Sequence, residues 1–347
     1  MNENDYAKLN SYLNDIFNYM EDFDECLFLN LSSIYNISEY IYNSLNENEF
    51  EEEEVCNDLT LLDVIKYSKE IVKEIDEKYV DVLENAINSG EIDFNNLEDE
   101  SYFLNLDDVG IININRSYNY QDVINLIHEF GHYLCNKGKK QTKLGYLLDE
   151  FIGKYFEIKA TIFLCNHNYN EEEIKASYCI EYLMDNIYEF MNYYPLLLMY
   201  YNFGNIDFKT QKLFSKYFYN IDYEQFENLC YDTLNLLEYI NDEYIKKCNN
   251  DSINIEKEDL VVELSRIFSE DYRYILGTLL SFYPFDRSVV LDLIDNINSS
   301  KYENITFQEL CKVLKIDLND NSFIKTLESS IWYFINNNIK KVKKWSL

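Results

Sequence analysis

Residues 128–132 carry the clearest chemical pattern in the chain, a His-Glu-x-x-His motif that reads His-Glu-Phe-Gly-His. On a helix, residues four apart lie on one face, so His128 and His132 can direct ring nitrogens at one zinc ion. Glu129 lies one step round the helix, where its carboxylate reaches a water on the metal rather than the metal itself. Zinc makes such a water acidic, and Glu129 then accepts its proton.

The scarcity of histidine argues that this motif is not accidental. The chain has three histidines in 347 residues, and two of them fall in the motif. Apolar residues recur at helical spacing around it, and Gly138 suits the end of a helix. These apolar residues are Val123, Leu126, Ile127, Phe130 and Leu134. The alternative, two structural histidines on a helix, is disfavoured by this concentration.

A catalytic zinc ion needs a third protein ligand. His167 is the only other histidine, but the next helical segment offers Glu150 and Glu157, seven residues apart and on one face. We favour Glu157, because the small Ala160 three residues later lets this helix pack closely against the zinc helix. Glu150 is the reserve ligand, or a partner that orients a ligand.

The region around the motif resembles the oligoendopeptidase F / thimet oligopeptidase family of zinc metallopeptidases. In that family a strand ending in Asn is followed by an Asp-Val pair and a Leu-x-His-Glu-x-Gly-His helix, as in residues 111–115 and 122–132 here. The family's third ligand is a Glu 25 residues after the second histidine, which corresponds to Glu157. The resemblance thus implies one zinc ion per chain, with Glu157 as the third ligand.

A second patch of the chain agrees with this family. The family has a Tyr-x-Tyr-x-x-Gly segment whose tyrosines line the site, and residues 272–277 read Tyr-Arg-Tyr-Ile-Leu-Gly. The resemblance implies that Tyr274, together with Tyr272, hydrogen-bonds the substrate carbonyl as it becomes an oxyanion. Because the chain has 33 tyrosines, such a pair means little by itself.

The chain also departs from the family pattern. The family's histidine shortly before the Tyr pair is missing, which leaves Arg266 or Arg273 to supply positive charge. The family's acidic residue seven positions after the third ligand corresponds to Leu164. The resemblance covers residues 102–166 well and 264–281 weakly. These departures motivate an alternative function, a catalytically weakened, metal-retaining peptide-binding protein derived from such a peptidase.

The elements that position the motif are expected to be mostly helices. Only 8 Gly and 2 Pro interrupt the chain, whereas β-branched runs around a Gly-containing turn predict a β-hairpin at about 102–116. We therefore expect a mainly α, zincin-like fold with this hairpin beside the zinc helix and a substrate cleft. Without a Gly/Pro-rich linker, 1–347 reads as one domain, with helical lobes at 1–100 and 169–347 flanking the hairpin and zinc-binding helices of 101–168.

The charge of the chain limits its partners. It has 63 Asp+Glu against 30 Lys+Arg, a formal net charge of −33. Such a surface repels phosphate, so nucleic acids and anionic membranes are disfavoured and basic peptides are attracted. The chain has eight cysteines without a Cys-x-x-Cys pair and begins without an apolar signal segment. This pattern predicts reduced thiols and a cytoplasmic location. No oligomeric state follows from it.

These observations together predict zinc-dependent hydrolysis of short, unstructured peptides, with a preference for basic ones. We expect the strand at 111–115 to pair with an extended peptide by β-augmentation. A zinc protease of another class, acting on a folded target, shares the motif, but the 25-residue ligand spacing counts against it.

Overall fold

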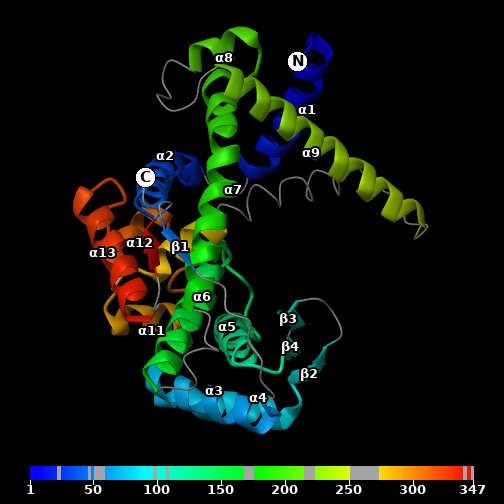
Figure 1. Cartoon of the computed structure of the whole chain (residues 1–347). Coiled ribbons are helices and arrows are strands. Elements are labelled where there is room, and N and C mark those ends of the chain that lie inside the picture. The colour runs from blue at the N-terminus through cyan, green and yellow to red at the C-terminus, as the bar shows by residue number, and fades with distance from the viewer. Residues whose placement is uncertain are drawn as a thin grey trace. The chain divides into compact units, whose positions relative to one another are not determined.

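The computed structural model describes residues 1–21, 25–45, 48–50, 59–96, 100–106, 109–167, 176–214, 223–250, 273–338 and 342–344. These residues are mainly helical, as predicted (Figure 1). The chain forms two compact units, one of Met1–Glu39 with Asn186–Tyr272 and one of Tyr40–Asp185 with Arg273–Leu347. The single-domain organisation stays a prediction.

The first unit is a set of amphipathic helices. It contains α1 (Glu3–Glu21), α8 (Phe208–Phe214), α9 (Tyr223–Asn250) and parts of α2 (Glu25–Leu45) and α7 (Ala176–Phe203). α1 packs against α9, and Lys8 pairs with Glu238 across them at 2.6 Å. Leu9, Leu13 and Ile16 are buried, as expected for residues that recur every three to four positions on one helix face.

The second unit contains the motif helix and its neighbours. Its helices are α3 (Leu61–Ile75), the 3-10 helix η1 (Glu77–Tyr79), α4 (Val80–Ser89), α5 (Gln121–Asn136), α6 (Lys143–Asn166), a helix at 273–281, α11 (Arg287–Asn296), α12 (Phe307–Leu314) and α13 (Asn321–Asn338). α5 and α6 pack against each other, and α3 packs against both (Figure 1). The motif therefore lies on a helix that is covered by other helices.

A small sheet covers another part of α5. Its strands are β2 (Ile92–Asn96), β3 (Tyr102–Leu106) and β4 (Val109–Asn115), in the order β2-β4-β3. β3 and β4 pair in antiparallel register from Tyr102↔Asn113 to Leu106↔Val109, which confirms the predicted hairpin. Both strands pack against α5, so the hairpin lies beside the motif helix as expected.

The position of β4 corrects one expectation. β2 pairs in parallel with β4, for example at Ile92↔Ile112, while β3 takes the other edge. A strand with both edges paired has no free backbone groups for a further strand, so an extended peptide cannot add to residues 111–115. Among the described residues, the outer edge of β3 pairs with no strand, and its Leu104 and Leu106 are exposed.

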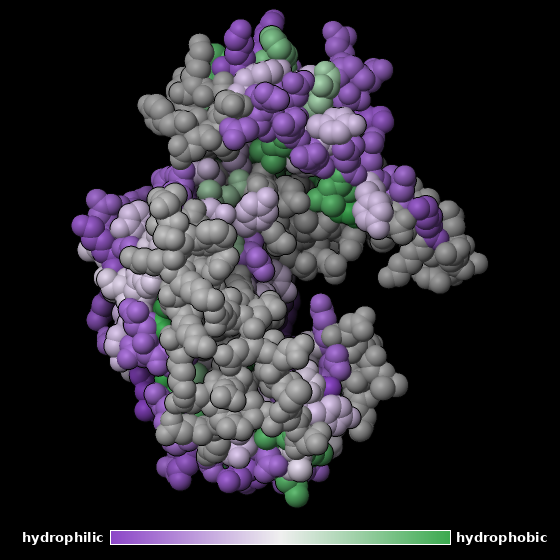
Figure 2. Space-filling model, viewed as in Figure 1, coloured by the Kyte–Doolittle hydropathy of each residue, from purple (hydrophilic) through white to green (hydrophobic). Residues whose placement is uncertain are grey.

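The two charged segments of the chain lie partly within the described residues. β1 (Asn48–Phe50) belongs to the acidic run at 47–58 and pairs antiparallel with β5 (Val342–Lys344) of the basic C-terminal tail. Hydrophilic residues dominate the described surface on the face that Figure 2 shows, as the net charge suggests. Within the described ranges, no helix is both long and apolar enough to cross a bilayer.

Candidate metal centre

An ion pair between half-buried Arg116 and buried Asp122 fixes the start of the motif helix. Asp122, which is fully buried in the first turn of α5, accepts hydrogen bonds from Arg116 Nε and from the backbone N–H of Ser117, each at 2.6 Å. Arg116 also donates to the carbonyl of Leu59 at 2.8 Å. A carboxylate at this end of a helix interacts favourably with its dipole. Arg116 thus joins the segment before α5 both to the first turn of α5 and to the backbone at Leu59.

His128 and His132 lie one turn apart on α5, and their Nε2 atoms are 3.0 Å apart. Their rings meet edge to face, with centroids 4.8 Å apart. His132 is buried and His128 is half-buried. The two histidines therefore present donor atoms to one small volume, as the motif predicted.

Glu150 on α6 completes a group of three donors. Its carboxylate oxygens lie 3.9 Å from the Nε2 atom of each histidine. Donor atoms of all three side chains lie within 4.8 Å of one another. Two donors on one tetrahedral zinc ion are about 3.4 Å apart. The observed distances lie on either side of this value, so the donor set fits a zinc ion.

Gly153 leaves the space next to these donors open. A Cβ atom at this position would lie 2.8 Å from Nε2 of His132 and 2.9 Å from Nε2 of His128. Real Cβ atoms essentially never approach other atoms so closely. A glycine is therefore required where α6 passes the two ring nitrogens, and the chain has one there.

The second nitrogen of each ring faces a carboxylate. Nδ1 of His128 lies 3.0 Å from Glu157 Oε2, and Nδ1 of His132 lies 3.1 Å from Asp149 Oδ1. Because an ionised carboxylate only accepts hydrogen bonds, Nδ1 of His128 donates to Glu157, while the charge of Asp149 lies beside Nδ1 of His132. In the neutral form of a ring whose Nδ1 carries the hydrogen, Nε2 has the lone pair that a metal ion needs.

The charges around the site favour ionised carboxylates. Burial alone would raise the pKa of Glu157, but Lys154, whose Nζ lies 2.8 Å away, and His128 outweigh burial and lower this pKa to about 2. Burial opposes a charge on His132, yet the carboxylate of Asp149 raises the His132 pKa to about 10. The carboxylates around the two imidazole rings thus favour a positive charge at this place in the protein. A bound metal cation would supply such a charge.

Glu129 lies beside the donors, and its pKa is shifted in the opposite direction to that of Glu157. Its side chain is buried, and burial raises its pKa above the ordinary value, although the two histidines partly oppose this shift. A carboxylate with a raised pKa is a better proton acceptor near neutral pH than an ordinary one. Glu129 is therefore suited to proton transfer.

The helix at 273–281 approaches the same centre. A Cβ on Gly277 would lie 2.8 Å from the Cβ of Glu150, so this helix contacts α6 closely at the third donor. The Arg273 guanidinium lies 3.6 Å from Glu150 Oε1 and 5.5 Å from the centroid of the Tyr274 ring. The Tyr274 ring thus lies beside Arg273, whereas Tyr272 and Arg266 lie outside the described residues.

The structure differs from the expectation about the two glutamates. Glu150, the expected reserve, lies beside the Nε2 atoms, whereas Glu157, the expected third ligand, faces Nδ1 of His128. His167 is exposed at the end of α6, where its ring stacks on Phe163. Sequence reasoning missed Asp149, Gly153 and Lys154. One available signal was the Lys three residues before Glu157, since a cation at that spacing on a helix pairs with a carboxylate.

Comparison with family models gave no match for this chain. Comparisons with curated proteins and with solved structures also found no significant match. The side chains of the site itself are therefore the basis for a function.

Proposed function

We propose that this protein is a zinc-dependent peptidase that hydrolyses short, unstructured peptides. The observation that carries the proposal is the meeting of the two Nε2 atoms with Glu150, one step from a buried Glu129. Two histidines and a carboxylate are a donor set found at catalytic zinc sites. A purely structural zinc site does not need a neighbouring proton acceptor.

Each chain residue has a defined role in the proposed reaction. His128, His132 and Glu150 would hold the zinc ion, while Glu157 and Asp149 orient the two rings. A zinc ion bound there supplies Lewis-acid chemistry, polarising the scissile carbonyl and making water nucleophilic at neutral pH.

Proton transfer and charge stabilisation fall to the protein. Glu129 accepts a proton from the attacking water and passes it to the nitrogen of the leaving amine as the amide bond breaks. Tyr274 donates a hydrogen bond to the carbonyl oxygen as negative charge develops on it. Arg273, beside Glu150, adds positive charge to this side of the site.

The resemblance to the oligoendopeptidase F / thimet oligopeptidase family supports this proposal in one respect and departs from it in another. If Glu150 is the ligand, it follows His132 by 18 residues, so the family spacing of 25 does not apply to it. Glu157 then stands seven positions after the ligand, where the family has an acidic residue, and the missing acid at Leu164 no longer counts as a departure.

A mixed peptide library tests the proposal. Zinc-loaded protein should release products detectable by mass spectrometry, and a chelator should stop their release. Glu129→Gln should keep zinc but reduce cleavage by about 10²- to 10⁴-fold, because the proton acceptor is lost. Glu303→Gln on an exposed site is the matched control and should cleave normally. Equal cleavage by wild type and Glu129→Gln would exclude Glu129 as the base.

The second candidate is a peptide-binding protein that retains the metal. It is favoured by the ion pair of Arg273 with Glu150. In this pair the carboxylate of Glu150 interacts with the Arg273 guanidinium, which competes with a metal ion for the same oxygen atoms. In the same experiment, peptides that stay bound to the zinc-loaded protein without cleavage would support this candidate.

A further inference from the structure

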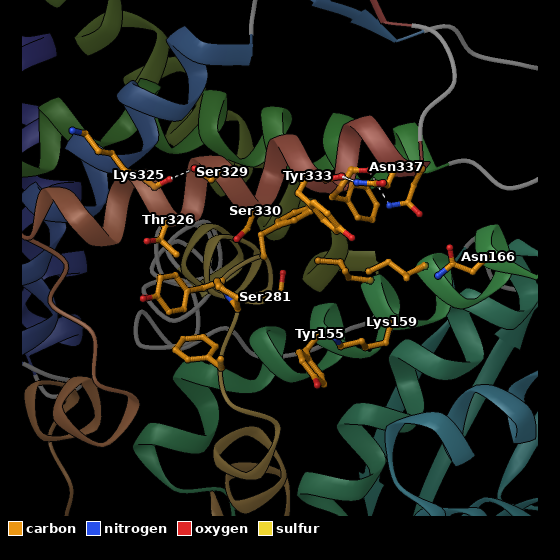
Figure 3. Close-up of a pocket in the computed structure, with 18 residues that line it drawn as sticks. Tyr155, Lys159, Asn166, Ser281, Lys325, Thr326, Ser329, Ser330, Tyr333 and Asn337 are labelled. Carbon is orange, nitrogen blue, oxygen red and sulfur yellow. Dashed lines mark hydrogen bonds between the residues drawn. The ribbon is translucent and has the colours of Figure 1, made fainter.

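A pocket of about 750 Å³ opens between α6, α13 and residues 281–285 (Figure 3). α6 contributes Tyr155 and Lys159 to it, which lie on the side of the helix opposite Gly153 and Glu157. α13 and residues 281–285 form the other walls. Figure 3 shows Ser330 and Tyr333 on α13 facing Tyr155 and Lys159 on α6.

The lining of this pocket differs in charge from the rest of the chain. In proportion to the composition, about three of its 18 residues would be acidic, yet none is Asp or Glu. It has two lysines, Lys159 and Lys325, and many aromatic side chains. Lys325 extends away from the pocket in Figure 3, so Lys159 is the cation that faces it. The pocket is apolar and locally basic in a strongly acidic protein.

Lys159 stands where this pocket meets a second cavity of about 300 Å³. Arg287 lines that second cavity, and Phe285 lines both. Within the described ranges, neither cation forms an ion pair with a carboxylate within 4.0 Å, although Glu74 also borders the second cavity. Partial loss of hydration is the larger cause that lowers the pKa of Lys159, and the charge of Arg287 lowers it further.

Lys159 and Arg287 are exposed, whereas the two cations at the motif are largely enclosed and each has a carboxylate partner. Arg116 pairs with Asp122 at 2.6 Å, and Lys154 pairs with Glu157 at 2.8 Å. Two neighbouring cations without a carboxylate repel each other, and a ligand that covers them and excludes water increases this cost unless it carries a negative charge. A bound anion removes the repulsion.

We propose that this pocket binds a small amphipathic anion. Its carboxylate or phosphate head lies between Lys159 and Arg287, and its apolar or aromatic body lies along Phe285, Tyr283 and Tyr333. The volume suits a small molecule, since ligand pockets typically enclose about 300–1,000 Å³. The site does not depend on the metal centre, which lies on the other face of α6.

Titration of the full chain with the fluorescent anion 8-anilinonaphthalene-1-sulfonate tests the head group. Lys159→Met should weaken binding by about tenfold, the cost of one charge-assisted contact. Lys325→Met is the matched control at the other end of the pocket and should change binding by less than about twofold. The neutral analogue N-phenyl-1-naphthylamine should bind both variants as it binds wild type. An equal loss in both lysine variants, or none in Lys159→Met, would overturn the proposal.

Two further arms test the pocket and the ligand body. Ser330→Phe fills the pocket and should abolish binding of the anionic dye, with folding checked by circular dichroism. Decanoate should displace the dye, whereas acetate and inorganic phosphate at the same concentration should not. Equal displacement by acetate or phosphate would show a simple ion site and overturn the amphipathic ligand. If Ser330→Phe does not fold, the lysine pair and the competition still decide the question.

Discussion

The two faces of α6 treat charge in opposite ways. On the face toward α5, Lys154 is buried and held 2.8 Å from Glu157, which in turn faces His128. On the other face, Lys159 and Arg287 lie near each other, and no carboxylate of the described residues pairs with either. The first face is a network with room for a cation, and the second is a pocket whose 18 lining residues include no Asp or Glu. One helix thus separates two sites of opposite charge preference.

The largest expected difference on the first face is in zinc affinity, between substitutions of Glu150 and of Glu157. Glu150→Ala removes a donor, so zinc affinity should fall by more than about 100-fold. Glu157→Ala removes a group that orients His128, and such losses cost about 10- to 100-fold. Competition with a chromogenic chelator measures both affinities. A larger loss in Glu157→Ala would instead make Glu157 the third ligand, as the family spacing implies.

Replacing each lysine of α6 tests the comparison of charges directly. Lys154→Met leaves Glu157 buried beside His128 and the Cys179 thiol but without its cation, and breaking such a buried pair should cost about 3 kcal/mol of unfolding free energy. Lys159→Met removes a charge that has no carboxylate partner, so the change should stay within about 0.5 kcal/mol. Urea denaturation of the metal-free proteins measures both. Equal destabilisation by the two substitutions would contradict the asymmetry between the faces.

Much of the site could be predicted from short-range patterns. The motif spacing placed His128 and His132 together, and the helical pattern from Gln121 matches α5. Gly138 follows the end of this helix with a φ of 64°, the left-handed conformation expected of a glycine there. The hairpin was also visible, because its two strands are adjacent in the sequence.

The rest depended on how distant segments meet. Glu150 and Glu157 share a helix face, so spacing alone cannot show which one reaches the Nε2 atoms. The choice depends on how far α6 is shifted along α5, and the contacts of Gly153 with the rings and of Gly277 with Glu150 fix this shift. The pairing of β2 with β4 was missed for a similar reason, since a parallel partner carries no turn signal.

Gly153→Ala should lower the zinc affinity of the first face and leave the pocket on the second face unchanged. The new Cβ would approach both Nε2 atoms to within 2.9 Å, so the rings must move and zinc affinity should fall by about tenfold or more. Ile162→Ala, on the pocket face of the same helix, is the matched control and should keep its zinc. Zinc analysis after dialysis measures both variants. Full zinc content in Gly153→Ala would show that the donors meet elsewhere.

The acidic first face and the net charge of −33 together predict the smallest effect, a salt dependence of cleavage. Raising ionic strength from about 0.05 to 0.3 M shortens the range of electrostatic attraction, so kcat/KM for a basic peptide should fall about three- to tenfold. A neutral peptide of the same length should change by less than about twofold, because it gains little from the field. The anionic dye at the second face should also bind more weakly in salt, since it is drawn to Lys159 and Arg287. Cleavage of basic and neutral peptides that responds equally to salt would show that the field of the chain does not select the substrate.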